Sequence, residues 1–354
     1  MSKRFNGSFK GVDKVSNIED ISSMANGVFD LKAQYTFSLP PEIIVPWLYG
    51  GTTNGYMINS GYSTPTRYLY IDKFSFASET DQTNVGSANT SVDYAFTASS
   101  DVAGYAIGGD RITSPPYYSR FIYKMPFASQ GLATYTGDLD LEVGRGASAA
   151  NQDYALAMLG GTFPPSGVPS AASRQTSSVQ RMPFASDTDG AITTGYIFGL
   201  QGNAGYSTQD YGWTAGGYYS APPTGTSSVT DTIRKWPFAA TPGTAEDVGD
   251  LTTTRSSGNP LQSDTHAYYL DDSPTIAEKF PFAVPVTSAL LSELDISSVP
   301  SSRGTTTSTT TGYLARGETE FHKLNYASDT SLVQITGGSP WSYYITAGGT
   351  GFKV

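Results

Sequence analysis

"YKMPFAS", residues 123–129, sets a basic residue, an apolar residue, a proline and a phenylalanine in a fixed order. The same basic-aromatic word returns as "IDKFSFAS" from Ile71, "VQRMPFAS" from Val179, "IRKWPFAA" from Ile233, "AEKFPFAV" from Ala277 and "FHKLNYAS" from Phe321. Its second aromatic residue recurs every 44 to 57 residues. Periods of about 45 to 50 residues are typical of propeller blades with four strands each. The word therefore predicts a chain built from repeats.

Two further patterns accompany this word. A short apolar Tyr-Gly word precedes it and is found at Gly55, Gly104, Tyr154, Tyr211, Ala267, Gly312 and Tyr343. A looser segment follows it and begins at Thr83, Gly137, Gly190, Asp247, Ser292 and Ser331. We interpret the three patterns as the second, third and outer strands of a blade. A Gly- and Ser-rich segment before each Tyr-Gly word is predicted to be the inner strand, where small residues fit closely around an axis.

The composition favours strands over helices. Charged residues make up 15% and aromatic residues 13% of the 354 residues, and Tyr, Gly, Ser and Thr are abundant. The intervals between the words lack the 3.6-residue apolar rhythm of helical solenoids and are rich in Gly and Pro. We therefore expect an all-β protein.

Two apolar positions in each basic-aromatic word are predicted to pack between adjacent blades. Residues two apart in a strand share a face, so both side chains point the same way. The pairs are Phe74 and Phe76, Met125 and Phe127, Met182 and Phe184, Trp236 and Phe238, Phe280 and Phe282, and Leu324 and Tyr326. The proline between them, at 126, 183, 237 and 281, lacks a backbone donor and is predicted to mark the end or a bulge of the third strand.

Seven Tyr-Gly words predict a seven-bladed β-propeller over residues 28–354. The last word has no outer strand behind it, and we expect residues 28–37 to supply that strand and to close the ring between the two ends of the chain. Closure of this kind protects strand edges that otherwise promote aggregation. Six blades with an irregular cap are the alternative. Residues 1–27 carry no repeat word and are predicted to form a separate N-terminal arm.

The order of a Gly-Gly strand and a strand that ends in a bulky apolar pair resembles the kelch repeat. The basic-aromatic words, whose consensus is "KFPFAS", and the "VGDL" word from Val248 further resemble kelch-like repeats in virion proteins of aquatic tailed bacteriophages. This resemblance covers roughly residues 28 to 354. It implies a structural virion protein of the tail, fibre or particle surface, present in multiple copies in a symmetric assembly with tail, portal or capsid proteins.

Charge and composition exclude several classes of partner and cofactor. The net charge of −10 argues against nucleic acid or an anionic membrane as the main partner. The absence of cysteine excludes disulfides and thiolate metal sites. The N-terminus lacks a signal peptide, and no apolar stretch reaches the ~20 residues of a membrane helix, so we expect no membrane insertion. We expect no cofactor and no metal, since Asp187 and Asp189 lack the further ligands of a calcium loop.

No pattern indicates catalysis. His266 and His322, the two histidines, lie in predicted strands of different blades, and no Gly-x-Ser-x-Gly nucleophile elbow is present. The sequence therefore favours a protein that is not an enzyme. A polysaccharide-acting enzyme stays an alternative, because sequence does not locate a carboxylate pair among 31 acidic residues.

Three groups of residues are candidates for partner contacts. The basic residue of each word (Lys73, Lys124, Arg181, Lys235, Lys279 and Lys323) either packs its stem on a neighbour with its charge paired or hydrated, or contributes to a ring of positive charge. Tyr-rich insertions between second and third strands place Tyr117, Tyr118, Tyr218 and Tyr219 on one predicted face, as binding residues or as inert elaborations. The basic arm residues Lys3, Arg4, Lys10 and Lys14 are predicted to dock on a partner.

These observations lead to one main hypothesis and one alternative. We expect a virion component anchored by its N-terminal arm, which contributes to host recognition by binding a surface glycan. The alternative is a glycan- or receptor-binding propeller that is not fixed in a virion.

Overall fold

The computed structural model describes residues 51–60, 69–79, 83–88, 92–111, 118–162, 174–175, 178–186, 191–195, 200–221, 226–239, 245–271, 277–291, 303–316, 320–329 and 332–335. All of them belong to the second of two compact units, Trp47–Val354; the first is Met1–Pro46. Strands, bridges, turns and bends account for the regular structure of this described part. It contains no helix long and apolar enough to cross a membrane.

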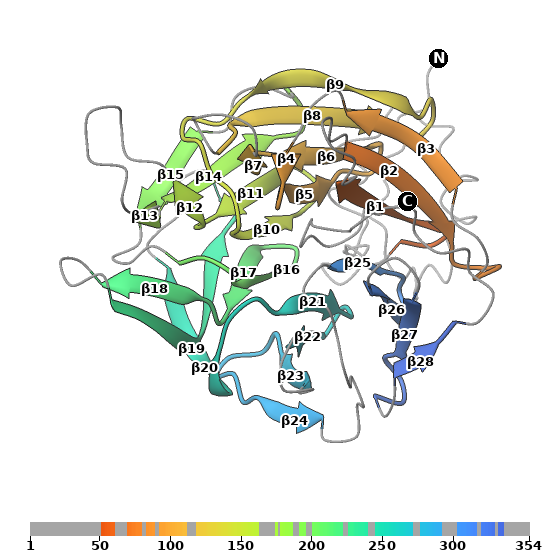
Figure 1. The fold of residues 1–354 in the computed structure, drawn as a ribbon. Coiled ribbons are helices and arrows are strands. Elements are labelled where there is room, and N and C mark those ends of the chain that lie inside the picture. Colours follow the sequence, from red (N-terminus) through yellow and green to blue (C-terminus); the bar gives the residue numbers. More distant parts are fainter. Residues whose placement is uncertain are drawn as a thin grey trace, which may run out of the picture. The chain divides into compact units, whose positions relative to one another are not determined.

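Six successive repeats contain most of the described strands, and we number them 1 to 6 (Figure 1). Repeat 1 contains β1 (Asn54–Ser60), β2 (Leu69–Ser75) and β3 (Thr83–Ala88). Repeat 2 contains β5 (Phe96–Ser99), β6 (Ala103–Ile107), β8 (Phe121–Pro126) and β9 (Gly131–Asp138). Repeat 3 contains β10 (Ala147–Ala150), β11 (Tyr154–Met158), β14 (Ser178–Pro183) and β15 (Ala191–Gly195).

The remaining repeats follow the same order. Repeat 4 contains β16 (Ala204–Ser207), β17 (Tyr211–Ala215), β19 (Thr226–Pro237) and β20 (Glu246–Arg255). Repeat 5 contains β21 (Asn259–Gln262), β22 (His266–Leu270), β23 (Ala277–Pro281) and β24 (Ala289–Leu291). Repeat 6 contains β25 (Arg303–Thr307), β26 (Thr311–Arg316), β27 (Glu320–Asn325) and β28 (Leu332–Gln334). Short additional strands are β4 (Val92–Asp93), β7 (Asp110–Arg111), β12 (Gly161–Thr162), β13 (Arg174–Gln175) and β18 (Tyr218–Ala221).

The repeat words occupy the expected strands. In repeat 3 the Tyr-Gly word forms β11, which pairs antiparallel with the inner strand β10 on one side and with β14, the basic-aromatic word, on the other. The four prolines of the words are the last residues of their strands β8, β14, β19 and β23. In β14, Pro183 pairs with Tyr154, whereas pairing with the outer strand β15 stops at Arg181. The nitrogen of Pro183, which has no hydrogen to donate, therefore lies beyond the last residue that pairs with the outer strand.

One outer strand differs from the prediction. In repeat 2 the outer strand is β9, which begins at Gly131, whereas we expected the segment from Gly137. In repeat 5 the described outer strand is β24, which ends at Leu291, and the expected segment from Ser292 lies outside the described residues. Outer strands bury few side chains, so apolar alternation constrains their position only weakly.

Repeats 1 and 2 share one seven-stranded sheet. Their outer strands β3 and β9 pair in parallel from Gly86 opposite Gly131, and the two strands run side by side in Figure 1. A Cβ on Gly86 would meet the main-chain oxygen of Gly131, so this approach requires a glycine. The other four repeats each form a separate sheet, with β18 added in repeat 4.

Inner strands approach one another closely, which explains their small residues. A Cβ on Gly205 in β16 would meet the backbone of Ser148 in β10. Side chains also connect the strands, since Ser148 Oγ donates to the Thr97 carbonyl at 2.7 Å. Gln262, fully buried, accepts from Ser207 N at 2.7 Å and donates to Ser207 O at 2.6 Å. Buried amide groups of this kind need such partners.

The apolar pairs of the words lie between repeats. All six first members are at most 2% exposed. Five of the six second members pack on an aromatic ring of the preceding repeat. The distances between ring centroids are 4.9 Å for Phe127–Tyr56, 4.9 Å for Phe184–Tyr105, 5.3 Å for Phe282–Trp213, 5.1 Å for Tyr326–Tyr268 and 5.2 Å for Phe76–Tyr313. The last of these contacts joins repeat 1 to repeat 6. The core therefore consists of a series of layers between sheets.

The described residues form an all-β, propeller-like arrangement. Gly51 N donates to Thr307 O at 2.9 Å, a second contact between the start of repeat 1 and the inner strand of repeat 6. Seven blades are not confirmed. The expected closing strand at residues 28–37 and the seventh Tyr-Gly word at Tyr343 both lie outside the described residues.

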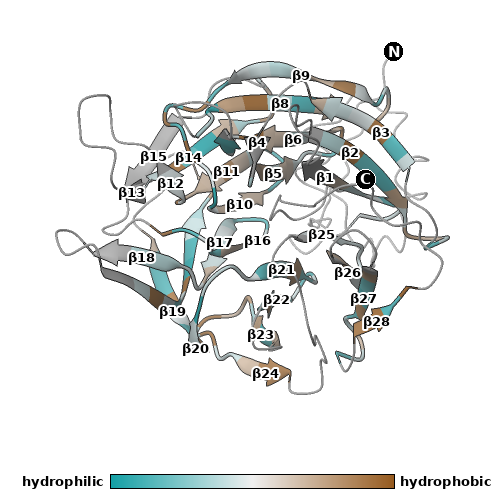
Figure 2. Cartoon of the chain, viewed as in Figure 1, coloured by the Kyte–Doolittle hydropathy of each residue, from teal (hydrophilic) through white to brown (hydrophobic). Residues whose placement is uncertain are grey.

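Hydrophobic side chains also reach the outer edge of the sheets. Figure 2 shows β24 as a hydrophobic strand, and its Leu290 is largely exposed. Leu132 of β9 and Val333 of β28 are similarly exposed.

Candidate functional site

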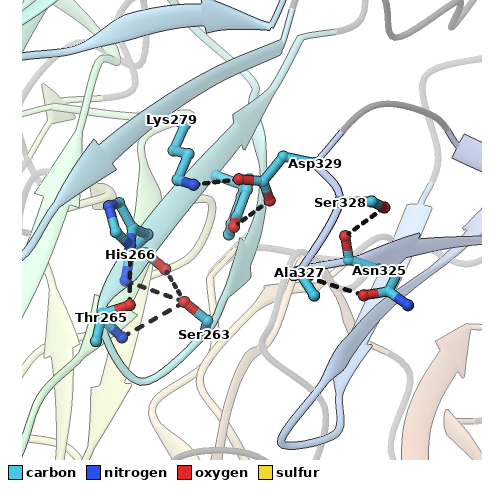
Figure 3. Close-up of polar contacts among 9 residues, drawn as sticks. Ser263, Thr265, His266, Lys279, Asn325, Ala327, Ser328 and Asp329 are labelled. Atoms are coloured by element: carbon cyan, nitrogen blue, oxygen red, sulfur yellow. Dashed lines mark hydrogen bonds and ion pairs between the residues drawn. The ribbon is translucent and has the colours of Figure 1, made fainter.

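Two basic residues of the repeat words, Lys279 and Lys323, connect one repeat to the next through ion pairs. Lys279 of β23 forms an ion pair with Asp329, which lies in the turn after β27, and Tyr268 Oη donates to the other Asp329 oxygen at 2.6 Å (Figure 3). Lys323 of β27 pairs in the same way with Glu79 after β2, and Tyr313 Oη donates to Glu79 at 3.0 Å. We call these two Lys-acid-Tyr groups the inter-repeat latches.

Other basic residues have equivalent structural contacts. Arg181 donates to the carbonyls of Phe238 and Ala239 in repeat 4, at 3.1 and 2.9 Å. Lys235 lies 3.2 Å from Glu246 and 4.7 Å from the centre of the Tyr211 ring. These contacts favour the packing interpretation of the basic residues over a ring of free positive charge.

His266 lies beside one latch but is not oriented by it. Its Nδ1 is 2.8 Å from Thr265 Oγ1, and its main-chain N–H donates to Ser263 (Figure 3). Burial and the nearby Lys279 ammonium lower the pKa of His266. His322, in repeat 6, lies on a different sheet.

A second polar group, the loop-face cluster, spans repeats 2 to 4. Its members are Asp110, Tyr118, Arg145, Gln201 and Tyr218. Asp110 begins β7 directly after the Gly-Gly turn and forms a bridge with Tyr118. Arg145 and Gln201 lie in the turns before inner strands β10 and β16. Tyr218 begins β18 and exchanges two main-chain hydrogen bonds with Gln201, at 2.9 and 3.0 Å.

Side chains in the loop-face cluster contact one another directly. Arg145 Nε donates to Asp110 Oδ2 at 2.5 Å, and Tyr218 Oη donates to Gln201 Oε1. A Cβ on Gly161 would meet both the Tyr118 hydroxyl and Gln201 Nε2, so these two polar groups converge where Gly161 has no side chain. Three repeats thus contribute to one polar cluster, in which Asp110, Tyr118 and Gln201 are buried.

Tyr118 and Tyr218 of the loop-face cluster are kept neutral mainly by burial. Burial raises the pKa of Tyr118, and the Asp110 carboxylate adds to the effect. Burial likewise raises the pKa of Tyr218, although Arg145 opposes the shift. Burial opposes ionisation of Arg145, but its ion pair with Asp110 outweighs this and raises its pKa. The tyrosines therefore offer hydroxyl groups, and the paired charges of Asp110 and Arg145 cancel.

An unusual backbone feature supports the loop-face cluster. The residues two positions before inner strands β5, β10, β16 and β21 are Tyr94, Arg145, Gly202 and Ser257, and all four have left-handed φ angles between 51° and 63°. Main-chain hydrogen bonds join them in order, from Arg145 N to Tyr94 O at 3.4 Å, Gly202 N to Arg145 O at 2.8 Å and Ser257 N to Gly202 O at 2.5 Å. We call these four residues the left-handed arc.

Three arc positions, Tyr94, Arg145 and Ser257, hold residues that the conformation disfavours. Only glycine adopts left-handed φ freely, and another residue costs roughly 1–2 kcal/mol there. Tyr94 and Arg145 nevertheless occupy such positions and lie against each other, with the guanidinium 4.9 Å from the ring centre. Tyr94 is 41% exposed and the Arg145 side chain 46% exposed, so core burial does not offset the strain.

The residues predicted to contact a partner lie in different environments. Tyr118 and Tyr218 come together through Gln201. Tyr219 packs instead on the apolar cluster that contains Trp236 and Phe238. Tyr117 and the four arm residues Lys3, Arg4, Lys10 and Lys14 lie outside the described residues, as do Asp187 and Asp189.

Sequence reasoning missed four residues of this surface, namely Tyr94, Asp110, Arg145 and Gln201. A signal for Asp110 was present, because it follows the Gly-Gly pair of "GYAIGGD" directly. The other three become visible only after the inner strands are aligned, since they lie two or three residues before these strands. Within the described part of the chain, no group of three or more His, Cys, Asp or Glu side chains is arranged to hold a metal ion.

A separate buried ionic group is centred on Arg255, two residues before Ser257 of the left-handed arc. Arg255 ends β20 and contacts Glu278 at 2.6 Å and Asp271 at 3.0 Å, and all three are buried. Glu278 also accepts from Thr252 N at 2.7 Å, and Arg255 O accepts from Gly217 N at 2.7 Å. The group therefore connects repeat 4 to repeat 5 close to Ser257 of the arc.

Comparisons with known proteins identify the fold alone. No protein-family model matches the chain, and no curated protein matches its sequence. Among solved structures the chain is similar to YjhT, a kelch-type propeller, with a TM-score of 0.53 and 12% identity over 68% of this chain and 82% of the YjhT chain. The chain is thus propeller-like, with a kelch-type structural neighbour.

Proposed function

We propose that this chain is a structural protein of a tailed-phage virion, anchored by its N-terminal arm, whose propeller binds a saccharide on the host surface through the loop-face cluster. The observation that carries the binding role is the convergence of Arg145, Gln201 and Tyr218 with an exposed Tyr94. The virion role is supported by the resemblance of the repeat words to kelch-like phage proteins.

The architecture suits a rigid platform for binding. The ring contact of Phe184 with Tyr105 joins repeat 3 to repeat 2, and Arg181 joins repeat 3 to repeat 4 through two main-chain carbonyls, so the three repeats of the loop-face cluster are packed on one another. Binding surfaces with preordered side chains lose less entropy when a ligand arrives. We further propose six blades, because repeat 6 contacts repeat 1 through Tyr313 and Phe76.

Binding is a better account of this site than catalysis. Hydrolysis of a glycosidic bond by the common mechanism needs two carboxyl groups about 5–10 Å apart. Within the loop-face cluster, as far as its residues are described, Asp110 is the one carboxylate, and it is paired with Arg145. Neutral Tyr118 and Tyr218 are suited to hydrogen bonding and to contact area.

Cross-linking mass spectrometry on purified particles that contain this chain tests the virion role. We expect links from Lys3, Lys10 or Lys14 to tail, portal or capsid proteins. A chain that fractionates away from particles and forms no such links contradicts the virion role and leaves a free binding propeller as the better account.

Competition for host adsorption tests the binding role. Purified full-length protein is expected to reduce phage adsorption, whereas a Tyr94→Ala/Arg145→Ala variant with unchanged circular dichroism is expected to lose this effect. Tyr135→Ala, which removes a ring that is exposed on outer strand β9, is the matched control and should compete normally. Equal competition by all three proteins contradicts binding at the loop-face cluster.

A further inference from the structure

The left-handed arc carries information about the kind of ligand. One of its equivalent positions is Gly202, the residue best suited to the conformation, whereas Tyr94 and Arg145 occupy the same position in neighbouring repeats. Tyr94 and Arg145 are exposed and stack on each other, so burial in the core does not offset their backbone strain. Backbone outliers of this type are concentrated at ligand sites, where the strain fixes side-chain direction.

A second, independent observation comes from a buried amide. Gln201 is 2% exposed, and its Oε1 accepts from Tyr218, whereas its Nε2 lies beside the Tyr118 hydroxyl without a hydrogen bond of acceptable geometry to a described residue. Both side-chain amide atoms of Asn203, which is also buried, have no hydrogen-bond partner among the described residues. Buried amides nearly always have partners, so polar atoms from outside the described chain are expected to bind here.

The charge balance limits the chemistry of this partner. Arg145 is paired with Asp110, so the cluster is neutral, and the whole chain carries a net charge of −10. An acidic ligand therefore meets no excess positive charge. A ligand rich in hydroxyl groups instead can accept from Arg145 and Gln201 Nε2, donate to Asn203 Oδ1 and place an apolar ring face on Tyr94.

We propose that Tyr94 and Arg145 of the left-handed arc, together with Gln201 of the loop-face cluster, bind a neutral sugar residue, with its ring on Tyr94 and its hydroxyl groups at Arg145 and the Gln201 amide. This inference rests on the saccharide-binding function proposed above and specifies the class of saccharide. Arg145 acts as a hydrogen-bond donor whose charge is compensated, so binding depends only weakly on salt concentration.

The test uses the full-length chain and two matched probes, galacto-oligosaccharide and oligogalacturonate of equal length, which differ in their carboxylates. Titration calorimetry or ligand-observed NMR measures binding to wild type, Tyr94→Gly, Arg145→Gly and Ser257→Gly. We expect the neutral probe to bind wild type and Ser257→Gly equally, with affinity reduced about ten-fold or more in Tyr94→Gly and Arg145→Gly. Tyr94→Gly relieves backbone strain, so its thermal midpoint is expected to stay the same or to rise.

Each other outcome has a defined meaning. Preferential, Arg145-dependent binding of oligogalacturonate overturns the neutral class but leaves saccharide binding in place. Equal binding of the neutral probe by wild type and Tyr94→Gly overturns the arc as the site. Failure of both probes, and of glucose and mannose oligosaccharides, to bind wild type overturns this inference together with the proposed binding function.

Discussion

The ring of Phe76 in repeat 1 stacks on the ring of Tyr313 in repeat 6, with centroids 5.2 Å apart and 17° between the ring planes. These residues are 237 positions apart in the chain, yet their contact has the same form as those between successive repeats. Phe74 extends this interface, because its ring lies 5.1 Å from Tyr313 and 4.6 Å from Phe321.

Truncation of Phe74 tests the contact between the ends of the repeat series. Phe74→Ala is expected to lower the free energy of unfolding by about 3–5 kcal/mol, because a buried phenylalanine is replaced by a cavity. Phe280→Ala, at the interface between repeats 5 and 4, is the matched control and should cost a similar amount. Urea unfolding measures both. A Phe74→Ala cost below about 1 kcal/mol would show that repeats 1 and 6 do not pack together.

Removal of Arg255 tests the buried ionic group. Arg255→Met leaves the Glu278 and Asp271 carboxylates without their cation in the interior, so we expect a loss of about 3–5 kcal/mol. Arg120→Met removes an exposed pair with Asp138 and should cost less than about 1 kcal/mol. Denaturant titration of the two variants gives the comparison. Similar small costs would contradict a buried, interdependent group.

The inter-repeat latches predict a loss of stability at alkaline pH. Burial and the hydrogen bond to Asp329 raise the pKa of Tyr268, and burial together with Glu79 raises that of Tyr313. In the unfolded chain both tyrosines ionise near pH 10. Above about pH 10 the folded state therefore holds protons that the unfolded state has released, and the free energy of unfolding falls as pH rises.

Unfolding free energies between pH 8 and pH 11 measure this effect. The double variant Tyr268→Phe/Tyr313→Phe has no hydroxyl to titrate at either latch, so its decrease above pH 10 should be smaller than in wild type. Identical pH dependence in the two proteins would contradict neutral, latch-bound tyrosines.

Much of the fold follows from local patterns in the sequence. The second strands are predictable because nearly all of their residues are buried between repeats, as in "YALAM" of repeat 3, and the third strands are predictable because the basic-aromatic word recurs. Outer strand β9 was predicted six residues too late, since its exposed side chains leave little apolar alternation. The number of blades depends on a contact between Phe76 and Tyr313, which no local pattern reports.

The candidate site was predictable only in part. Tyr118 and Tyr218 were found because Tyr-rich insertions follow the Gly-Gly turns. Arg145 and Tyr94 were missed because their importance lies in a left-handed backbone conformation that Gly202 shares. A cluster whose members come from three different repeats leaves no signature in the sequence of any one repeat.

The latches always join a basic residue of one repeat to the turn of the following repeat. Lys279 with Asp329 and Lys323 with Glu79 obey this rule, the latter across the ends of the repeat series. Both boundaries of repeat 6 therefore use the same kind of connector. A second copy of repeat 6 would present compatible connectors on both sides, so duplication of this unit can change the number of units without the invention of a new interface.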